Sequence, residues 1–84
     1  MKRIKGEKCF LVDLKIGQVA KILDILMDKK ELKIHLLEMG IVKNTILKIK
    51  KVSPLGEPFV IEIRGYELYL RKHEMKKIYV EVLE

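Results

Sequence analysis

Glu31–Val42, with the sequence ELKIHLLEMGIV, is the stretch that decides the fold of this 84-residue chain. Its apolar residues recur along one face of a helix, because Leu36 and Met39 follow Leu32 by four and seven positions. Two more apolar side chains widen this stripe: Ile34 and Leu37. The pattern predicts a helix that lies across a hydrophobic core and closes it, rather than one that stands free in solvent.

Both ends of this helix carry sequence signals. Asp28 precedes the first turn and Glu31 follows it by three residues, as in a capping box, so we expect the Asp28 side chain to cap the helix. Gly40 occupies the position at which a left-handed residue ends a helix, and apolar Ile41 follows it as the usual hydrophobic closure. The sequence therefore predicts that the helix stops at Gly40.

Length and composition fit one small domain over residues 1–84, with 49% hydrophobic residues to build a core. Cys9 is the single cysteine, which excludes an internal disulfide, and its apolar neighbours Phe10 and Leu11 predict that it is buried. A lone cysteine and the lack of a signal peptide favour a cytoplasmic location. Charged residues interrupt every apolar run before the roughly 20 residues that cross a bilayer, so we expect no direct membrane insertion.

The net charge of +6 suits an acidic partner or nucleic acid, since it attracts anions and releases counterions. A lysine-rich solvated surface explains the same charge without any partner. Most of the excess is lysine, which binds phosphates and base edges less specifically than arginine does. The charge alone therefore favours the solvated surface.

Five segments alternate apolar and polar residues and are expected to form strands: Val19–Leu26, Thr45–Val52, Phe59–Ile63, Tyr66–Leu70 and Ile78–Val82. The first segment also fits a helix by periodicity, but its β-branched residues favour a strand. In the last three segments we expect Phe59 and Tyr66 to face the core, whereas Tyr69 and Tyr79 face outward.

The connections complete this outline. We expect Arg64–Gly65 to form a two-residue hairpin turn and Ser53–Pro58 to form a stiff loop. Residues 71–77 are expected to form a polar corner with one helical turn. Residues 1–8 read as a loose terminus or an added strand, and residues 9–14 as a short apolar run. We therefore expect an all-β fold: a small, closed or nearly closed barrel of about five strands with one short α-helix after the first long strand.

Candidate catalytic and metal-ligating residues do not form a recognisable site. Cys9, His35 and His73 lie far apart in the sequence, without the close spacing of metal ligands. Ser53 lies beside Pro54 in a turn, and we expect its hydroxyl group to stabilise that turn rather than to act as a nucleophile. His35 and Glu38 share a helix face, but a surface histidine is the simpler interpretation. We expect no catalytic residue, no bound cofactor and no metal site, and we interpret the chain as a binding module.

Nucleic-acid binding stays open as an alternative. Small β-barrels bind single strands by stacking bases on exposed aromatic side chains within a basic groove. Tyr69 and Tyr79 are the candidate stacking residues, with four basic residues on neighbouring strands: Lys48, Lys50, Lys51 and Arg64. Because the chain has only five aromatic residues, we expect no nucleic-acid partner.

The order of these motifs resembles the FeoA domain family over Leu11–Val82. The similar segments are LKIGQV at Leu14–Val19, LLEMGI at Leu36–Ile41, PLGEP at Pro54–Pro58, GYELYLR at Gly65–Arg71 and IYV at Ile78–Val80. Two positions depart from the family pattern. His35 stands where the family often has arginine, and Asn44 stands where it has glycine. A partner contact at His35 would be sensitive to pH, whereas a role in covering the end of the barrel would not.

The resemblance implies an SH3-like barrel that serves ferrous iron uptake in the cytoplasm. It implies contact with the cytoplasmic GTPase portion of a FeoB-type transporter, and it links the family to transition metal ions. A similar domain occurs at the C-terminus of DtxR-type repressors, which leaves a metal-sensing role through His35 or His73 as an alternative. Self-association through an open barrel edge also stays open.

Within this picture we expect a protein-binding groove on the outside of the barrel. Its apolar members are Leu55 at the tip of the proline loop, Tyr69 and Tyr79, while Lys48, Lys50 and Lys51 steer an acidic partner toward them. Pro54 and Pro58 stiffen the loop and so reduce the entropy lost on binding.

Overall fold

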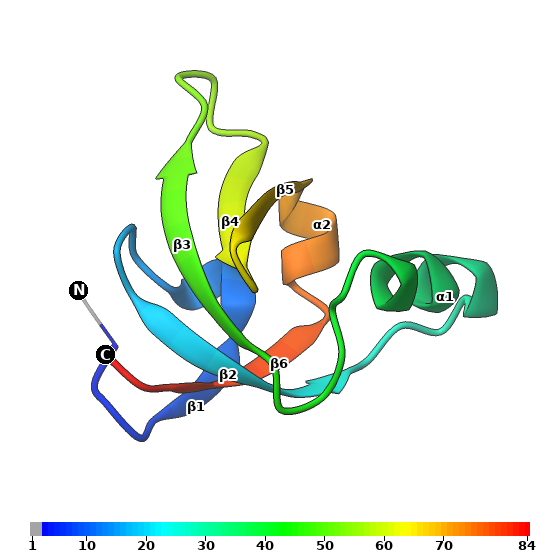
Figure 1. Cartoon of the computed structure of the whole chain (residues 1–84), viewed down its shortest axis with the longest axis horizontal. Helices are drawn as coiled ribbons and strands as arrows, with labels where there is room; N and C mark the ends of the chain where they lie inside the picture. The colour runs from blue at the N-terminus through cyan, green and yellow to red at the C-terminus, as the bar shows by residue number, and fades with distance from the viewer. Residues whose placement is uncertain (1–2) are drawn as a thin grey trace.

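The computed structural model describes residues 3–84 and shows six strands and two helices (Figure 1). The strands are β1 (Lys8–Phe10), β2 (Val19–Ile25), β3 (Ile46–Val52), β4 (Phe59–Ile63), β5 (Tyr66–Leu70) and β6 (Ile78–Val82). The helices are α1 (Lys30–Glu38) and α2 (Lys72–Met75), and a 3-10 turn at Leu11–Asp13 follows β1. The fold is therefore mostly β, with α1 after the first long strand as predicted.

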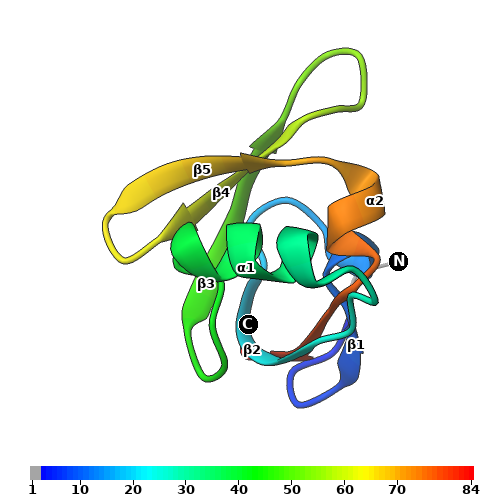
Figure 2. The ribbon, with the colours of Figure 1, turned by 90° about the vertical axis from the view of Figure 1, so that its right-hand side faces the viewer.

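All six strands form one antiparallel sheet in the order β1-β6-β2-β3-β4-β5. Figures 1 and 2 show that this sheet curls round on itself, and the buried apolar residues lie inside the curl. Two irregularities in register, at Ile22/Asp24 on β2 and at Ile49/Lys51 on β3, add local bends. A single sheet in a small domain encloses a core in this way, because it has no second sheet to pack against.

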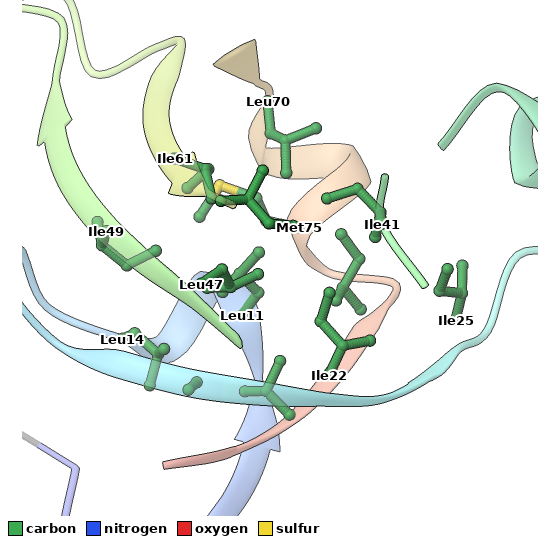
Figure 3. Close-up of a cluster of buried hydrophobic side chains, with 14 of the residues drawn as sticks. Leu11, Leu14, Ile22, Ile25, Ile41, Leu47, Ile49, Ile61, Leu70 and Met75 are labelled. Atoms are coloured by element: carbon green, nitrogen blue, oxygen red, sulfur yellow. The ribbon is translucent and has the colours of Figure 1, made fainter. Parts of the chain in front are cut away.

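The core fills the inside of the curl, where side chains from opposite strands meet (Figure 3). Its largest fully buried apolar members are Leu11, Ile22, Leu36, Ile41, Leu47, Ile49, Ile61, Ile63, Leu70, Met75 and Ile78. Met75 comes from α2 and Ile41 from the loop after α1, so these two segments help to close the curl. Cys9 is buried as predicted, and burial raises the pKa of its thiol.

The five predicted strands are confirmed, and the sixth is β1. It consists of three residues, which are too few to show an alternating pattern, and its pairing with β6 at Cys9↔Val80 is decided by tertiary contact. The predicted hairpin turn at Arg64–Gly65 is also confirmed, because both residues have the positive φ that such a turn requires.

Helix α1 buries less of its surface than the sequence predicts. Leu36 is fully buried, and Met39 packs partly against the core, but Leu32, Ile34 and Leu37 remain 43%, 44% and 40% exposed. The predicted closure of the barrel by this whole stripe is therefore wrong. The curled sheet leaves an opening that Leu36 and Ile41 already fill, so the rest of the helix has no apolar surface to cover.

The N-terminal cap is also corrected. Lys29 is the N-cap residue, and no side chain makes a cap hydrogen bond there, because the helix begins at Lys30 and Asp28 lies one residue too early. The predicted C-terminal stop is confirmed, since Gly40 has φ of +95° and the backbone N–H of Ile41 donates to the Leu36 carbonyl.

Tyr66 holds this helix end against the β4–β5 hairpin. Contrary to the prediction of an inward ring, it is 43% exposed, and its hydroxyl donates to the Met39 carbonyl at 2.5 Å. A Cβ atom on Gly40 would clash with the Tyr66 hydroxyl oxygen. Glycine is therefore required at position 40 for two reasons: the backbone conformation and the close approach of this ring.

Replacing Gly40 by alanine tests the second reason. Gly17 is the control, because its φ of +93° is equivalent and nothing lies within 4 Å of an added Cβ. We expect Gly17→Ala to lower the free energy of unfolding by about 1–2 kcal/mol through backbone strain. Gly40→Ala should cost about 1 kcal/mol more, because the Tyr66 hydrogen bond must break. Urea denaturation measures both, and equal losses would contradict the close-contact argument. In a Tyr66→Phe background, the extra cost should disappear.

Candidate protein-binding surface

The outer face of β3, β4 and β5 carries a hollow of about 360 Å³. It is lined by Lys51, Val52, Ser53, Pro54, Pro58, Val60 and Tyr69. Val60 and Tyr69 are direct cross-strand partners, and Lys51 faces Val60 from the other side. Three neighbouring strands therefore build one continuous surface, which we call the proline-loop pocket.

Val60 forms the apolar base of this pocket. It is only 4% exposed, yet it is not a member of the main core cluster. Its neighbour Ile61 is fully buried and does belong to that cluster, so successive residues of β4 serve opposite faces of the sheet. Burial of Val60 on the outer face shows that the pocket residues themselves cover it.

The irregularity on β3 supplies the basic side of the pocket. Lys48 and Lys50 point outward by simple alternation, and the shift in register between Ile49 and Lys51 turns Lys51 outward as well. A regular strand would point Lys51 to the inner face, where a lysine is costly to bury. The bulge thus places a lysine beside an apolar pocket.

The loop Ser53–Pro58 is fixed at its base and at its side. The Ser53 N–H donates to the Pro58 carbonyl at 3.1 Å, and the Gly56 N–H donates to the Ser53 carbonyl at 2.8 Å. The Glu57 carboxylate accepts a hydrogen bond of 2.6 Å from the Lys72 N–H at the start of α2. Leu55 at the tip is 95% exposed, so this loop presents an apolar side chain from a restrained backbone.

Lys50 is engaged by acidic neighbours. Its ammonium group donates to the Glu67 carboxylate on β5 and lies 3.9 Å from Glu62 on β4. The hydrogen bond and the charge of Lys50 lower the pKa of Glu67, and the same contact raises the pKa of Lys50. Lys50 is therefore a less available charge for a partner than Lys51.

The structure separates the other predicted site residues. Tyr79 is half-buried on β6, where its ring centroid lies 5.3 Å from that of Phe10, so it does not join the proline-loop pocket. Lys48 lies at a second hollow of about 390 Å³, beside Ile46 and Arg64. Tyr69, 60% exposed, lines the proline-loop pocket, whereas Leu55, 95% exposed, lies in the loop beside it and is not one of the lining residues. Tyr69 and Tyr79 also do not form the joint stacking platform that the nucleic-acid alternative needs.

Residues 3–84 contain no group of three or more His, Cys, Asp or Glu side chains placed to hold a metal ion. His35 lies on α1 and His73 on α2, and both are exposed. No helix formed by these residues has the length and apolar character needed to cross a membrane.

Fold and surface together define a class: a small all-β module with a partly apolar hollow on the outside of a curled sheet. The chain belongs to the FeoA domain family, whose family model matches residues 10–82. The predicted family is thus confirmed.

Solved structures of this family have the same fold. A FeoA-like protein from Clostridium acetobutylicum is 35% identical, covers 93% of this chain and 90% of its own, and has a TM-score of 0.82. Iron(II) transport protein A from Clostridium thermocellum is also 35% identical, over 88% of this chain and 45% of its own, with a TM-score of 0.81.

A third structure supports the predicted barrel type. The zinc complex of FeoA from Stenotrophomonas maltophilia, described as a prokaryotic SH3 domain protein, covers 87% of this chain and 89% of its own. At 24% identity and a TM-score of 0.74, it shows the fold alone. The fold is accordingly SH3-like, as predicted. No curated protein sequence matches this chain.

The ion pair between Lys50 and Glu67 makes a pH-dependent prediction. Because the pair lowers the pKa of Glu67, any stability that it supplies is fully present above pH 4.5, the ordinary glutamate pKa. That stability is lost as the pH falls through the lowered pKa of Glu67. We expect a side-chain carboxyl titration by NMR to place the Glu67 midpoint below 4.5. In Lys50→Met the midpoint should move back up, because the main cause of the shift is gone. An unchanged midpoint in Lys50→Met would contradict the assigned cause.

Proposed function

We propose that this protein is an accessory subunit of ferrous iron uptake that works by protein contact in the cytoplasm. Membership of the FeoA family supports the pathway, as does the similarity to an iron(II) transport protein. The partner we propose is the cytoplasmic GTPase portion of a FeoB-type transporter. The proposal assigns no chemical reaction to this chain, because recognition alone accounts for the surface described above.

One observation carries the proposed contact surface: the restrained loop that presents Leu55 next to a preformed apolar pocket. An exposed leucine on a mobile loop must be ordered when it binds, and that ordering reduces affinity. Here the hydrogen bonds at Ser53, Gly56 and Glu57 fix the loop before binding. Tyr69, with Val60 beneath it, adds a rigid aromatic group of the kind that contributes strongly to interfaces.

The charges around the pocket favour an acidic partner. Lys51 lines the pocket, and Lys48 lies on the same strand, one residue before Ile49, where the register shift begins. Such rim lysines act mainly on the rate of association, which makes binding faster at low salt. We therefore propose Leu55 and Tyr69 as the apolar contacts, with Lys48 and Lys51 as steering charges.

Binding of the purified cytoplasmic portion of a FeoB-type transporter tests this function. We expect Leu55→Ser and Tyr69→Ser each to weaken binding by about tenfold, because each removes an apolar contact from the centre of the surface. Ile16→Ser is the matched control: Ile16 is 54% exposed but lies in the turn before β2, away from the pocket. Calorimetric titration measures the three affinities.

Two outcomes would overturn the proposal in different ways. If the unmodified protein does not bind the transporter portion, the partner is wrong. If it binds and all three variants bind equally well, the partner is right and the proline-loop pocket is not the contact. A thermal melt of each variant confirms that folding is unchanged.

A further inference from the structure

A third hollow, largely apolar, lies between the two helices, away from the proline-loop pocket. It has a volume of about 260 Å³ and is lined by Met27, Asp28, Lys29, Leu32, His73 and Lys77. Figure 2 shows the first turn of α1 and helix α2 at the same side of the molecule, whereas Figure 1 places the proline loop and α1 at separate corners. We call this hollow the interhelix pocket.

The interhelix pocket has a fixed frame. The Leu26 N–H donates to the Lys77 carbonyl at 2.7 Å, which holds the segment before α1 against the segment after α2. Met27 packs against the main core and gives the hollow an apolar base. At the other end of α1, buried Leu36 and the hydrogen bond from Tyr66 to Met39 fix the helix. Leu32 is therefore held at the pocket while remaining 43% exposed.

The charge around this pocket is strongly positive. Residues 26–33 and 71–77 contain seven Lys and Arg residues against three Asp and Glu residues, a net charge of +4 in a protein of +6. Among the described residues, no ion pair involves any of these seven basic side chains. One of the three acids, Glu74, is used inside its own helix, where it accepts a hydrogen bond of 2.9 Å from the Arg71 N–H.

The arrangement of apolar residues on α1 favours a protein segment over a flat surface. A helix turns by about 100° per residue, so Leu32 lies on the same side as buried Leu36, whereas Ile34 and Leu37 point well away from Leu32. A membrane-bound helix would need Leu32 to share one outward face with Ile34 and Leu37, and Leu32 lies on another side of α1. A second copy of this chain is also a poor occupant, because two surfaces of the same positive charge repel each other.

We propose that the interhelix pocket is a second docking site, which takes one large apolar side chain from an acidic segment of a partner protein. The apolar side chain lies against Leu32 and Met27, and flanking Asp or Glu side chains meet Lys29 and Lys77. The site is separate from the proline-loop pocket, so the protein can hold two partner segments at once. This assignment rests on the geometry and charge of the pocket and does not require the proposed transporter contact.

Peptide binding followed by NMR on the full-length protein tests the assignment. The probe is a short peptide of Glu and Ala with one central Phe, compared with the same peptide carrying Ala at the centre and with a version carrying Lys in place of Glu. We expect amide shifts in residues 26–33 and 73–77 with the acidic Phe peptide. Exchange of Phe for Ala should weaken binding by about tenfold, and the Lys version should not bind.

Two pairs of variants separate this pocket from general charge attraction. Leu32→Ser should weaken binding of the Phe peptide by about tenfold, whereas Leu37→Ser should not, although both leucines are on α1 and similarly exposed. Lys29→Glu with Lys77→Glu should abolish binding. Lys5→Glu with Lys8→Glu makes the same change in net charge near β1 and should leave most of the affinity intact.

Three results would overturn the proposal: equal affinity for the Phe and Ala peptides, equal effects of Leu32→Ser and Leu37→Ser, or shifts outside the two segments. Vesicles containing anionic lipid provide the remaining comparison. Stronger binding to vesicles than to the Phe peptide, lost equally in both leucine variants, would assign α1 to a membrane surface instead.

Discussion

The structure depends on one constraint: a single antiparallel sheet must enclose its own apolar face. In a chain of 84 residues only a limited fraction of the surface can be buried, and no second sheet is present among the described residues. Curling brings β2, β3 and β4 around the core, and bends at the two register shifts make the curl tighter. Every other feature follows from how the remaining openings are filled.

The openings are closed by few side chains, and this leaves surface available for binding. Met75 on α2 fills one gap, while Leu36 and Ile41 fill another. Because one helical side chain is enough, the rest of α1 keeps apolar residues in solvent and borders a hollow instead of covering the core. Because few side chains are needed to close the core, the other apolar side chains of α1 remain exposed.

Charge is distributed unevenly over this framework. On the outer sheet face, Lys50 is balanced by Glu67 and Glu62, so Lys48 and Lys51 carry the positive charge of β3. The segments that flank the two helices carry most of the net charge. The overall value of +6 therefore describes neither surface well, and a partner meets two regions with different electrostatic character.

Sequence patterns determined the features that depend on neighbouring residues. The five longer strands, the Arg64–Gly65 hairpin and the stop at Gly40 were predictable, because alternation and positive-φ turns are local properties. The family was predictable as well, from the order of its motifs. Val60 was missed as a site residue. The sequence did contain two signals. The adjacent lysines at 50 and 51 indicate a bulge, and the adjacent apolar residues at 60 and 61 indicate that β4 has an apolar side chain on its outer face too.

Only the tertiary structure decided which predicted residues come together. In the sequence, strand alternation predicts that the side chains of Tyr69 and Tyr79 both face outward. The curl and the order of the strands place them on different surfaces. Strand β1 exists because β6 offers an edge for it, and α1 exposes Leu32 and Leu37 because Leu36 and Ile41 already fill the opening. The sequence determined the local elements, since their forces act between near neighbours. The closure of the core decided which faces remained for binding, since that depends on contacts between residues distant in the chain.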